Sequence, residues 1–301
     1  MFSVLIATIG YVLLAFVFIL DKIILSKSVS KPVVYTFYST IFLLAVFLLY
    51  PLGVQTLFGV HLFWALFSGL TFGFALWFMF IAIKKGETSH ISPFIGGIIT
   101  VATYIISYFV LSEQLSTFQL FGIGILIFSS FLLSFEKSRK HNGFHIGFVW
   151  AIGSGILFAL SHVSAKYIYE LYPFLTGIVW TRGTTGLVGI ITLFFPSVLK
   201  TFKKRKRKRK TKGKKHVALL IIVTKILGVL ANLLVQYALA IGSVTIVMAL
   251  SGLQFALMFL FILLLTKFLP KIFREYFTRR EIFVQTTAIL LVVVGYIFFV
   301  F

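Results

Sequence analysis

Long apolar stretches, separated by charged residues or by Pro and Gly clusters, follow one another along the whole chain. A helix of roughly 20 apolar residues crosses the hydrocarbon core of a bilayer. The pattern predicts ten such helices, over Phe2 to Leu20, Val33 to Tyr50, Leu62 to Ile83, Ile91 to Leu111, Phe118 to Phe135, Phe148 to Tyr167, Phe174 to Phe195, Val217 to Ala240, Val244 to Leu265, and Ile282 to Phe301. The first stretch lacks a basic leader and a small-residue cleavage site, so we expect it to remain as a helix.

The loops between these stretches alternate in charge. Those after the first, third, fifth, seventh and ninth stretches hold 25 Lys and Arg residues, and the intervening loops hold none. Cytoplasmic loops are enriched in Lys and Arg. Because a missed or extra span would exchange the two sides, the alternation supports ten spans in a multi-pass protein of the plasma (cell inner) membrane. It also predicts cytoplasmic basic loops and external termini.

The predicted spans divide into two groups of five around the hydrophilic segment Glu136 to Gly143. Since five is odd, two similar halves insert in opposite orientations, which is the inverted-repeat plan of many secondary transporters. We expect one repeat over 1–140 and a second over 144–301, with a basic cytoplasmic loop at 200–216. Segment 267–280 mixes aromatic and basic residues, so an interfacial amphipathic helix and a solvated loop both fit it.

Composition agrees with a lipid environment and excludes several kinds of chemistry. Hydrophobic residues make up 60% of the chain, and mean hydropathy is +1.07. The chain has no Cys, which excludes disulfides, thiolate metal sites and Cys nucleophiles. It has a single Asp, no HExxH motif and no phosphate-binding loop. We therefore expect that the protein is not an enzyme and binds no metal or cofactor. We also expect that it carries out transport driven by gradients.

Two hairpins, one in each half, share a pattern of small and polar residues. The first reads AIKKGETSHISPF and runs on to VLSEQL and the apolar helix FGIGILIFSS; the second reads YALAIGSVTIVMALSG and precedes the helix near Glu281. These segments resemble the EamA family of the drug/metabolite transporter superfamily. The resemblance implies an all-α fold of ten transmembrane helices in two inverted five-helix repeats around a central cavity. It also implies export or exchange of small metabolites.

Ionisable side chains inside spans are costly and mark candidate functional sites. All seven acidic residues, Asp21 included, fall at predicted helix ends or in loops. That placement argues against exchange of protons for cationic substrates through a central acid. The basic candidates are His162, Arg182 and Lys225, and Lys225 shares one helical stripe with Asn232 and Gln236.

A fixed cation beside amides suits a carboxylate or phosphate group of a substrate. The alternative interpretation is structural. In it, Lys225 reaches out to the membrane surface, Arg182 caps a broken helix, and the amides join helices by hydrogen bonds.

Small and aromatic residues provide further candidates. Ser92 begins a small-residue stripe on the fourth predicted helix, which favours close helix packing over ligand contact, and Pro93 could open the backbone there. Gly69 and Gly73 form a GxxxG pair that predicts packing. Trp77 and Trp180 lie deep enough to stack on a ligand, although such residues commonly fill bundles or anchor helices at the interface.

The run from Lys200 to Lys215 holds 12 basic residues in 16 positions. Such a tract can bind nucleic acid phosphates, but its place between two spans favours anionic lipid headgroups instead. A solvated topology signal is the simpler interpretation. We expect no nucleic-acid partner.

These observations predict a secondary transporter that works by alternating access. We expect the third, fourth, eighth and ninth helices to converge on its cavity. Its substrates would be small metabolites, such as amino acids or related organic anions and zwitterions, moved in the direction of export. One alternative is a sugar-phosphate or nucleotide-sugar carrier, and another is a non-transporting membrane scaffold that acts through its basic loop. A homodimer is compatible with the sequence.

Overall fold

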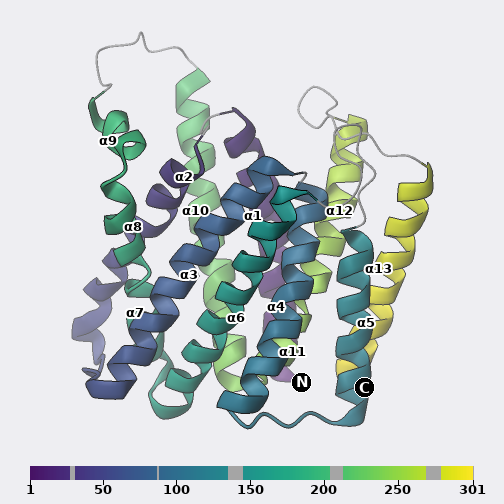
Figure 1. Cartoon of the computed structure of the whole chain (residues 1–301), viewed down its shortest axis with the longest axis horizontal. Coiled ribbons are helices and arrows are strands. Elements are labelled where there is room, and N and C mark those ends of the chain that lie inside the picture. The colour runs from purple at the N-terminus through teal and green to yellow at the C-terminus, as the bar shows by residue number, and fades with distance from the viewer. Residues whose placement is uncertain (28–30, 87, 135–144, 204–212, 269–278, 301) are drawn as a thin grey trace.

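In a computed structural model, the described residues form helices joined by turns and contain no strand (Figure 1). These residues are 1–27, 31–86, 88–134, 145–203, 213–268 and 279–300. The elements are α1 (Phe2–Lys27), α2 (Pro32–Thr40), the 3-10 helix η1 (Ile41–Leu52), α3 (Gly59–Lys85), α4 (Thr88–Val110), α5 (Thr117–Leu133), α6 (Ile146–Leu171), α7 (Phe174–Gly183), α8 (Gly186–Leu193), α9 (Pro196–Lys203), α10 (Gly213–Ile241), α11 (Val244–Ala249), α12 (Ser251–Phe268) and α13 (Arg279–Val300). Both termini lie at the lower end of the bundle in Figure 1, whereas α9 ends and α10 begins at the upper end.

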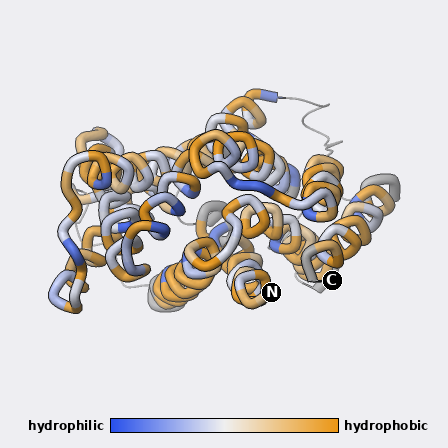
Figure 2. The backbone as a smooth tube through the Cα atoms, turned by 90° about the horizontal axis from the view of Figure 1, so that it is seen from below, coloured by the Kyte–Doolittle hydropathy of each residue, from blue (hydrophilic) through white to orange (hydrophobic). Residues whose placement is uncertain are grey.

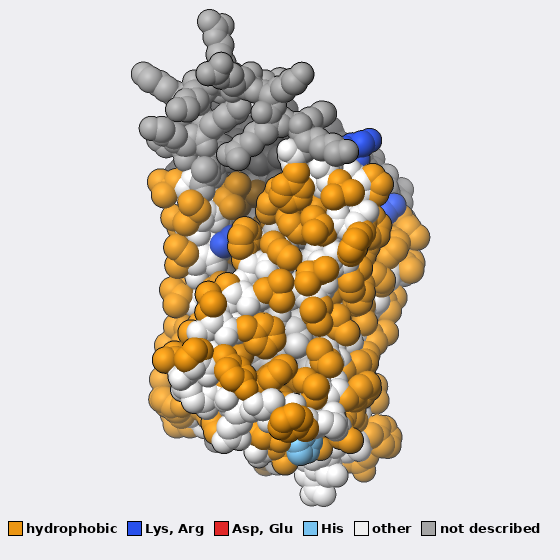
Figure 3. Space-filling view, turned by 90° about the vertical axis from the view of Figure 1, so that its left-hand side faces the viewer, with side chains coloured by type: hydrophobic (Ala, Val, Ile, Leu, Met, Phe, Trp, Pro, Cys, Tyr) orange, Lys and Arg blue, Asp and Glu red, His pale blue; other side chains and the backbone are white. Residues whose placement is uncertain are grey.

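Eight helical segments in the described residues are long and apolar enough to cross a membrane. They are Phe2–Asp21, Pro32–Leu52, Gly59–Lys85, His90–Val110, Ile146–Leu171, Phe174–Leu193, Leu219–Ile241 and Val244–Thr266. The other two predicted spans coincide with shorter apolar helices, Thr117–Leu133 and Ile282–Phe298. Hydrophobic positions predominate along the helices (Figure 2), and hydrophobic side chains are the commonest kind on the described part of the face in Figure 3. The chain is therefore a helical, multi-pass membrane protein.

Helix α1 is longer than the sequence pattern predicts. It continues past Leu20 to Lys27, so Asp21 lies within the helix and not in a loop. No Pro or Gly occurs between Leu20 and Lys27 to end the helix. Most of the predicted interfacial segment 267–280 and the centre of the basic loop 200–216 lie outside the described residues.

Three of the predicted spans are interrupted along their length. The second changes from α2 to the 3-10 geometry of η1 after Thr40, the seventh breaks between α7 and α8, and the ninth breaks at Leu250. Helix α4, by contrast, continues through Pro93. Pro93 therefore does not divide its helix, and the ninth span breaks without a proline.

The break between α7 and α8 is built from Gly and Thr residues. After α7 ends at Gly183, Thr184 Oγ1 donates hydrogen bonds to the carbonyls of Trp180 (2.7 Å) and Ala65 (3.2 Å). Such back-bonding by Thr competes with the helical ladder and bends helices. Across the break, Leu44 and Phe47 of η1 pack on Gly186 and Gly183.

The two glycines of the GxxxG pair bring α3 close to this break. A Cβ at Gly69 would collide with the Thr184 side chain and lie 2.7 Å from the Thr185 backbone nitrogen, and a Cβ at Gly73 would lie 2.5 Å from Val188. Small residues at such positions let helix backbones approach each other closely. The close approach fixes α3 against α7 and α8.

Two long helix pairs form the frame of the bundle. Helix α3 packs most extensively against α6, and α1 packs most extensively against α10. In the α3–α6 pair, Ser68 and Ser161 each donate a 2.8 Å hydrogen bond to the other's carbonyl. Polar groups of this kind join helices where no water can compete.

Candidate functional site

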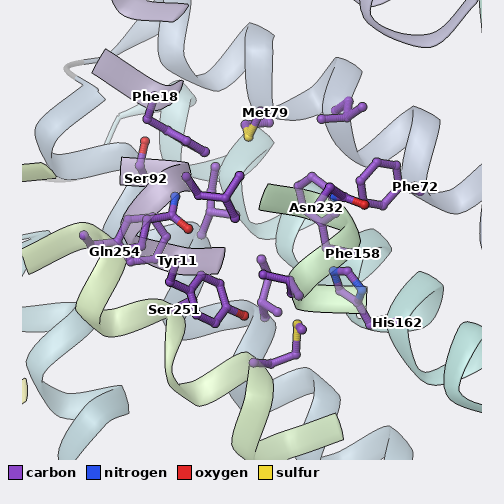
Figure 4. Close-up of a pocket in the computed structure, with 17 residues that line it drawn as sticks. Tyr11, Phe18, Phe72, Met79, Ser92, Phe158, His162, Asn232, Ser251 and Gln254 are labelled. Carbon is purple, nitrogen blue, oxygen red and sulfur yellow. The ribbon is translucent and has the colours of Figure 1, made fainter. Parts of the chain in front are cut away.

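A cavity of about 160 Å³ lies inside the bundle (Figure 4). It is lined by residues of α1, α3, α4, α6, α10, α11 and α12, namely Tyr11, Leu14, Phe18, Phe72, Leu76, Met79, Ser92, Ile95, Ile99, Phe158, His162, Asn232, Val235, Met248, Ser251, Gln254 and Phe255. The third, fourth, eighth and ninth predicted helices thus all contribute to it. So do the first and the sixth, through Tyr11, Phe18 and His162.

The cavity wall is mostly apolar and carries two polar ends. None of the described residues that line it is Asp, Glu, Lys or Arg. Asn232 and His162 lie near Phe72 on the right of Figure 4, whereas Ser92, Gln254 and Ser251 lie on the left, with Ser251 below the other two. A wall of this kind suits an organic molecule with an apolar body and few polar groups.

Arg182 lies directly behind the Phe72 wall. Its side chain is 4% exposed, and its guanidinium carbon is 4.0 Å from the centroid of the Phe72 ring. None of its three guanidinium nitrogens has a hydrogen-bond partner among the described residues. A buried charge without a hydrogen-bond partner is unfavourable, and an anionic group is the kind of partner that would complement the Arg182 guanidinium.

A small hydrogen-bond network surrounds Arg182. Tyr169 Oη donates to Gln236 Oε1 at 3.1 Å, and the Gln236 amide nitrogen is 3.4 Å from His162 Nδ1. Arg182 is near enough to His162 and Tyr169 to interact electrostatically with both. Since His162 also lines the cavity, the network and Phe72 connect Arg182 with the cavity wall.

Lys225 is not a free cation, contrary to the interpretation of the sequence. Its Nζ is 3.7 Å from Asp21 Oδ1 and donates to Tyr35 Oη and Ser39 Oγ, each at 3.2 Å. Tyr35 in turn donates to the Asp21 carboxylate. Because the pattern ended α1 at Leu20, Asp21 was predicted to lie in a loop, and the pairing with Lys225 was missed.

The three polar residues predicted to share a stripe of α10 have separate partners. Lys225 meets Asp21, Asn232 lines the cavity, and Gln236 joins the network beside Arg182. The stripe turns inward only toward its lower end, because the Lys225 side chain is 36% exposed whereas Gln236 is fully buried. Asn232 lines the cavity, and Gln236 lies 3.4 Å from the cavity residue His162.

The two candidate tryptophans do not line the cavity. Trp180 donates from its indole nitrogen to the Gln55 carbonyl at 3.0 Å and packs edge-on against Phe47. Trp77 packs edge-on against Phe195. Both fill gaps between helices near the molecular surface.

Several cavity residues were missed in the sequence analysis. Gln254 and Ser251 are polar residues in an apolar span, and that signal could have marked them. Phe18, Phe72 and Phe158 gave no signal, because the chain has 37 Phe residues and most positions of its spans are apolar.

Comparisons with known proteins identify the fold alone. No known family model and no curated protein matches the sequence. Among solved structures, 27 chains match. One of them, described only as the crystal structure of a protein, aligns over 99% of this chain and 94% of its own with a TM-score of 0.64. At 15% identity, this likeness carries no information about activity.

Proposed function

We propose that this protein is a gradient-driven transporter of the EamA type that carries small organic acids or zwitterions by alternating access. The observation that carries this proposal is Arg182, a buried cation without a hydrogen-bond partner in the described chain, beside an apolar cavity. An anionic group of the substrate would meet the guanidinium through charge-assisted hydrogen bonds. We infer that the substrate enters the cavity first and that Phe72 moves aside to admit its anionic group.

The acidic side chains of the described residues are engaged elsewhere. Asp21 pairs with Lys225, Glu170 lies 3.5 Å from Lys166, and Glu113 accepts a hydrogen bond from Thr245 at 2.5 Å. The side chains of Glu87, Glu136, Glu275 and Glu281 lie outside the description. A ligand is therefore the simplest source of the anion that Arg182 lacks.

The helix arrangement supports two related halves with ten spans. Suppose that each of the first five predicted spans corresponds to the span five places later in the chain. The α1–α10 contact then corresponds to the α6–α3 contact, and the α5–α13 contact corresponds to itself. The breaks correspond in part, because the second and seventh spans are both interrupted, whereas the ninth span breaks at Leu250 and its counterpart α4 is continuous. Interrupted helices at matching positions are typical of transporters built from inverted repeats, in which substrates bind between the repeats.

The charge distribution supports the orientation that we infer. Lys and Arg side chains on the face in Figure 3 are confined to the upper part, toward the end where α9 finishes. We infer that this end is cytoplasmic. The Asp21–Lys225 pair lies between the cavity and that end, because Asp21 follows Phe18 on α1 and Lys225 precedes Asn232 on α10.

Two other functions have less support. A nucleotide sugar is much larger than a cavity of about 160 Å³, and Lys225 is already paired with Asp21. The scaffold function rests on the basic loop, most of which lies outside the described residues.

The test is transport by the purified protein in vesicles. Counterflow of labelled amino acids and organic acids should be measured for the wild type, Arg182→Gln and Arg182→Lys. We expect Arg182→Gln to weaken anion affinity roughly 30-fold or more and Arg182→Lys to retain part of it. Lys166→Gln is the matched control, because Lys166 is another cation inside a span whose partners are Glu170 and the Ala240 carbonyl. Equal effects of Arg182→Gln and Lys166→Gln, or counterflow of none of these solutes, would contradict the proposal.

A further inference from the structure

The end of the cavity opposite Phe72 holds polar groups that the proposed function does not use. Ser92 Oγ and Ser251 Oγ are buried and have no hydrogen-bond partner in the described part of the chain, and their side chains are 1% and 7% exposed. Buried hydroxyl groups are nearly always hydrogen-bonded, so two such groups at one site require an explanation.

Gln254 is a third polar residue of the same cavity wall. Gln254 is one turn after Ser251 on α12, is 3% exposed and lines the same cavity (Figure 4). Tyr11, the fourth polar side chain in this part of the wall, already donates its hydroxyl proton to the Val247 carbonyl at 2.8 Å. Ser92, Ser251 and Gln254 are therefore polar side chains of this wall that have no hydrogen-bond partner within the described residues, and we treat them as one polar cluster that can bind a ligand group.

The chemistry of this cluster favours an uncharged hydroxyl. A carboxamide and two rotatable serine hydroxyls both donate and accept hydrogen bonds, as a hydroxyl does. An ammonium or carboxylate group would lose its hydration without meeting an opposite charge, because no Asp, Glu, Lys or Arg is among the described lining residues. A purely apolar group would leave all three side chains without partners.

The size of the cavity restricts the rest of the ligand. Its volume of about 160 Å³ is close to that of an engineered protein cavity, about 150 Å³, that binds benzene. The body of the ligand is therefore about the size of one aromatic ring, in contact with walls such as Phe158 and Phe255.

We propose that Ser92, Ser251 and Gln254 form a second subsite, which binds an uncharged hydroxyl at the end of the ligand remote from its acidic group. This inference rests on the proposed function and adds to it a substrate class, namely small hydroxylated acids with an apolar body. The subsite selects among acids, whereas Arg182 binds the acidic group that they share.

The experiment compares two probes that differ in one hydroxyl, 4-hydroxyphenylacetate and phenylacetate. Dissociation constants are measured by calorimetry on the full chain in lipid nanodiscs. We expect the wild type to bind the hydroxylated probe about 10-fold more tightly, since an unmade hydrogen bond to buried groups costs about one factor of ten. Ser92→Ala, Ser251→Ala and Gln254→Met should each reduce this preference toward one.

Two controls identify the cause of any change. Ser154→Ala removes a buried hydroxyl that donates to the Ala75 carbonyl at 2.9 Å and does not line the cavity, so the preference should stay. Ser251→Thr keeps a hydroxyl and should retain the preference even if Ser251→Ala fails to fold.

Each result decides between the two proposals. Arg182→Gln should weaken both probes equally and leave their ratio unchanged. If it weakens neither probe while the ratio persists, the proposed role of Arg182 fails and the subsite stands. Equal affinity of the wild type for both probes, no binding of either, or an unchanged ratio in all three subsite variants would overturn the subsite. The last of these results would mean that ordered water occupies the cluster.

Discussion

Lys225 Nζ lies 3.7 Å from Asp21 Oδ1 and joins α10 to α1 on one side of the cavity. Asp21 is three residues beyond Phe18 and Lys225 is seven before Asn232, which correspond to about 4.5 Å and about 10 Å along the helix axes. Lys225 also donates to Tyr35 and Ser39 of α2. In the proposed repeat, this contact joins the first half to the second, so it must open if the halves separate at that end.

Removal of both charges from this pair should destabilise the protein by less than the sum of the two single removals. Asp21→Asn or Lys225→Met leaves a partly buried charge without its partner, at a cost of about 1–3 kcal/mol. The double variant removes both charges, and its cost should be smaller than the sum of the single costs. Thermal unfolding in detergent measures all three. Strictly additive costs would show that the two side chains do not interact.

A cross-link across the same pair should stop transport. The chain has no Cys, so Asp21→Cys/Lys225→Cys introduces the only two thiols. A short bifunctional thiol reagent that can be cleaved by a reductant should abolish counterflow, and the reductant should restore it. Each single Cys variant, treated in the same way, is the control. Full transport by completely cross-linked protein would mean that α1 and α10 need not separate.

Gly69→Ala should disturb the position of Arg182 through the helix break. The added methyl group would meet Thr184 and lie 2.7 Å from the Thr185 nitrogen, and overpacking of this kind costs about 1–3 kcal/mol. Gly124→Ala is the matched control, because a Cβ on that glycine of α5 would meet nothing within 4 Å. We expect a lower melting temperature and weaker anion binding for Gly69→Ala only. Similar behaviour of the two variants would exclude the close approach of α3.

Single introduced cysteines should report the proposed orientation. The contacts of Gln55 use its backbone, which accepts from Trp180 and donates to Thr176, so Gln55→Cys should fold normally. An impermeant thiol reagent added to intact cells should label Gln55→Cys and should not label Lys206→Cys until the membrane is opened. The reverse pattern would invert the topology.

The sequence predicted the features that depend on local composition. Apolar length located the eight helical segments of the described residues that are long enough to cross a membrane, because lipid imposes that length on a span. That property could not reveal that Asp21 meets Lys225, since two residues more than 200 positions apart are brought together by the packing of α1 on α10. Helix length was misjudged for a related reason. When a span is predicted from sequence, a charged residue is taken to end it. In the folded bundle the helix can continue past that residue, because a neighbouring helix supplies a partner for the charge.

The cavity was harder to predict than Arg182. A lone Arg in an apolar stretch stands out against its neighbours, whereas Phe72, which separates it from the cavity, resembles the lipid-facing Phe residues. The inward side of a helix is normally predicted from an amphipathic pattern. Helices of a membrane bundle show little of this pattern, because both their inward and their lipid-facing sides are apolar.

The 3-10 geometry of η1 affects how the protein fits its bilayer. A 3-10 helix rises about 2.0 Å per residue and an α-helix about 1.5 Å, so the 12 residues of η1 extend about 6 Å further than the same residues would in α geometry. That difference is similar to the range of hydrocarbon thickness among cellular membranes. Because Leu44 and Phe47 of η1 rest on the glycines that flank the α7–α8 break, hydrophobic mismatch at this helix would be transmitted to the segment that carries Arg182. Hydrophobic mismatch at η1 would therefore bear on the proposed anion site around Arg182.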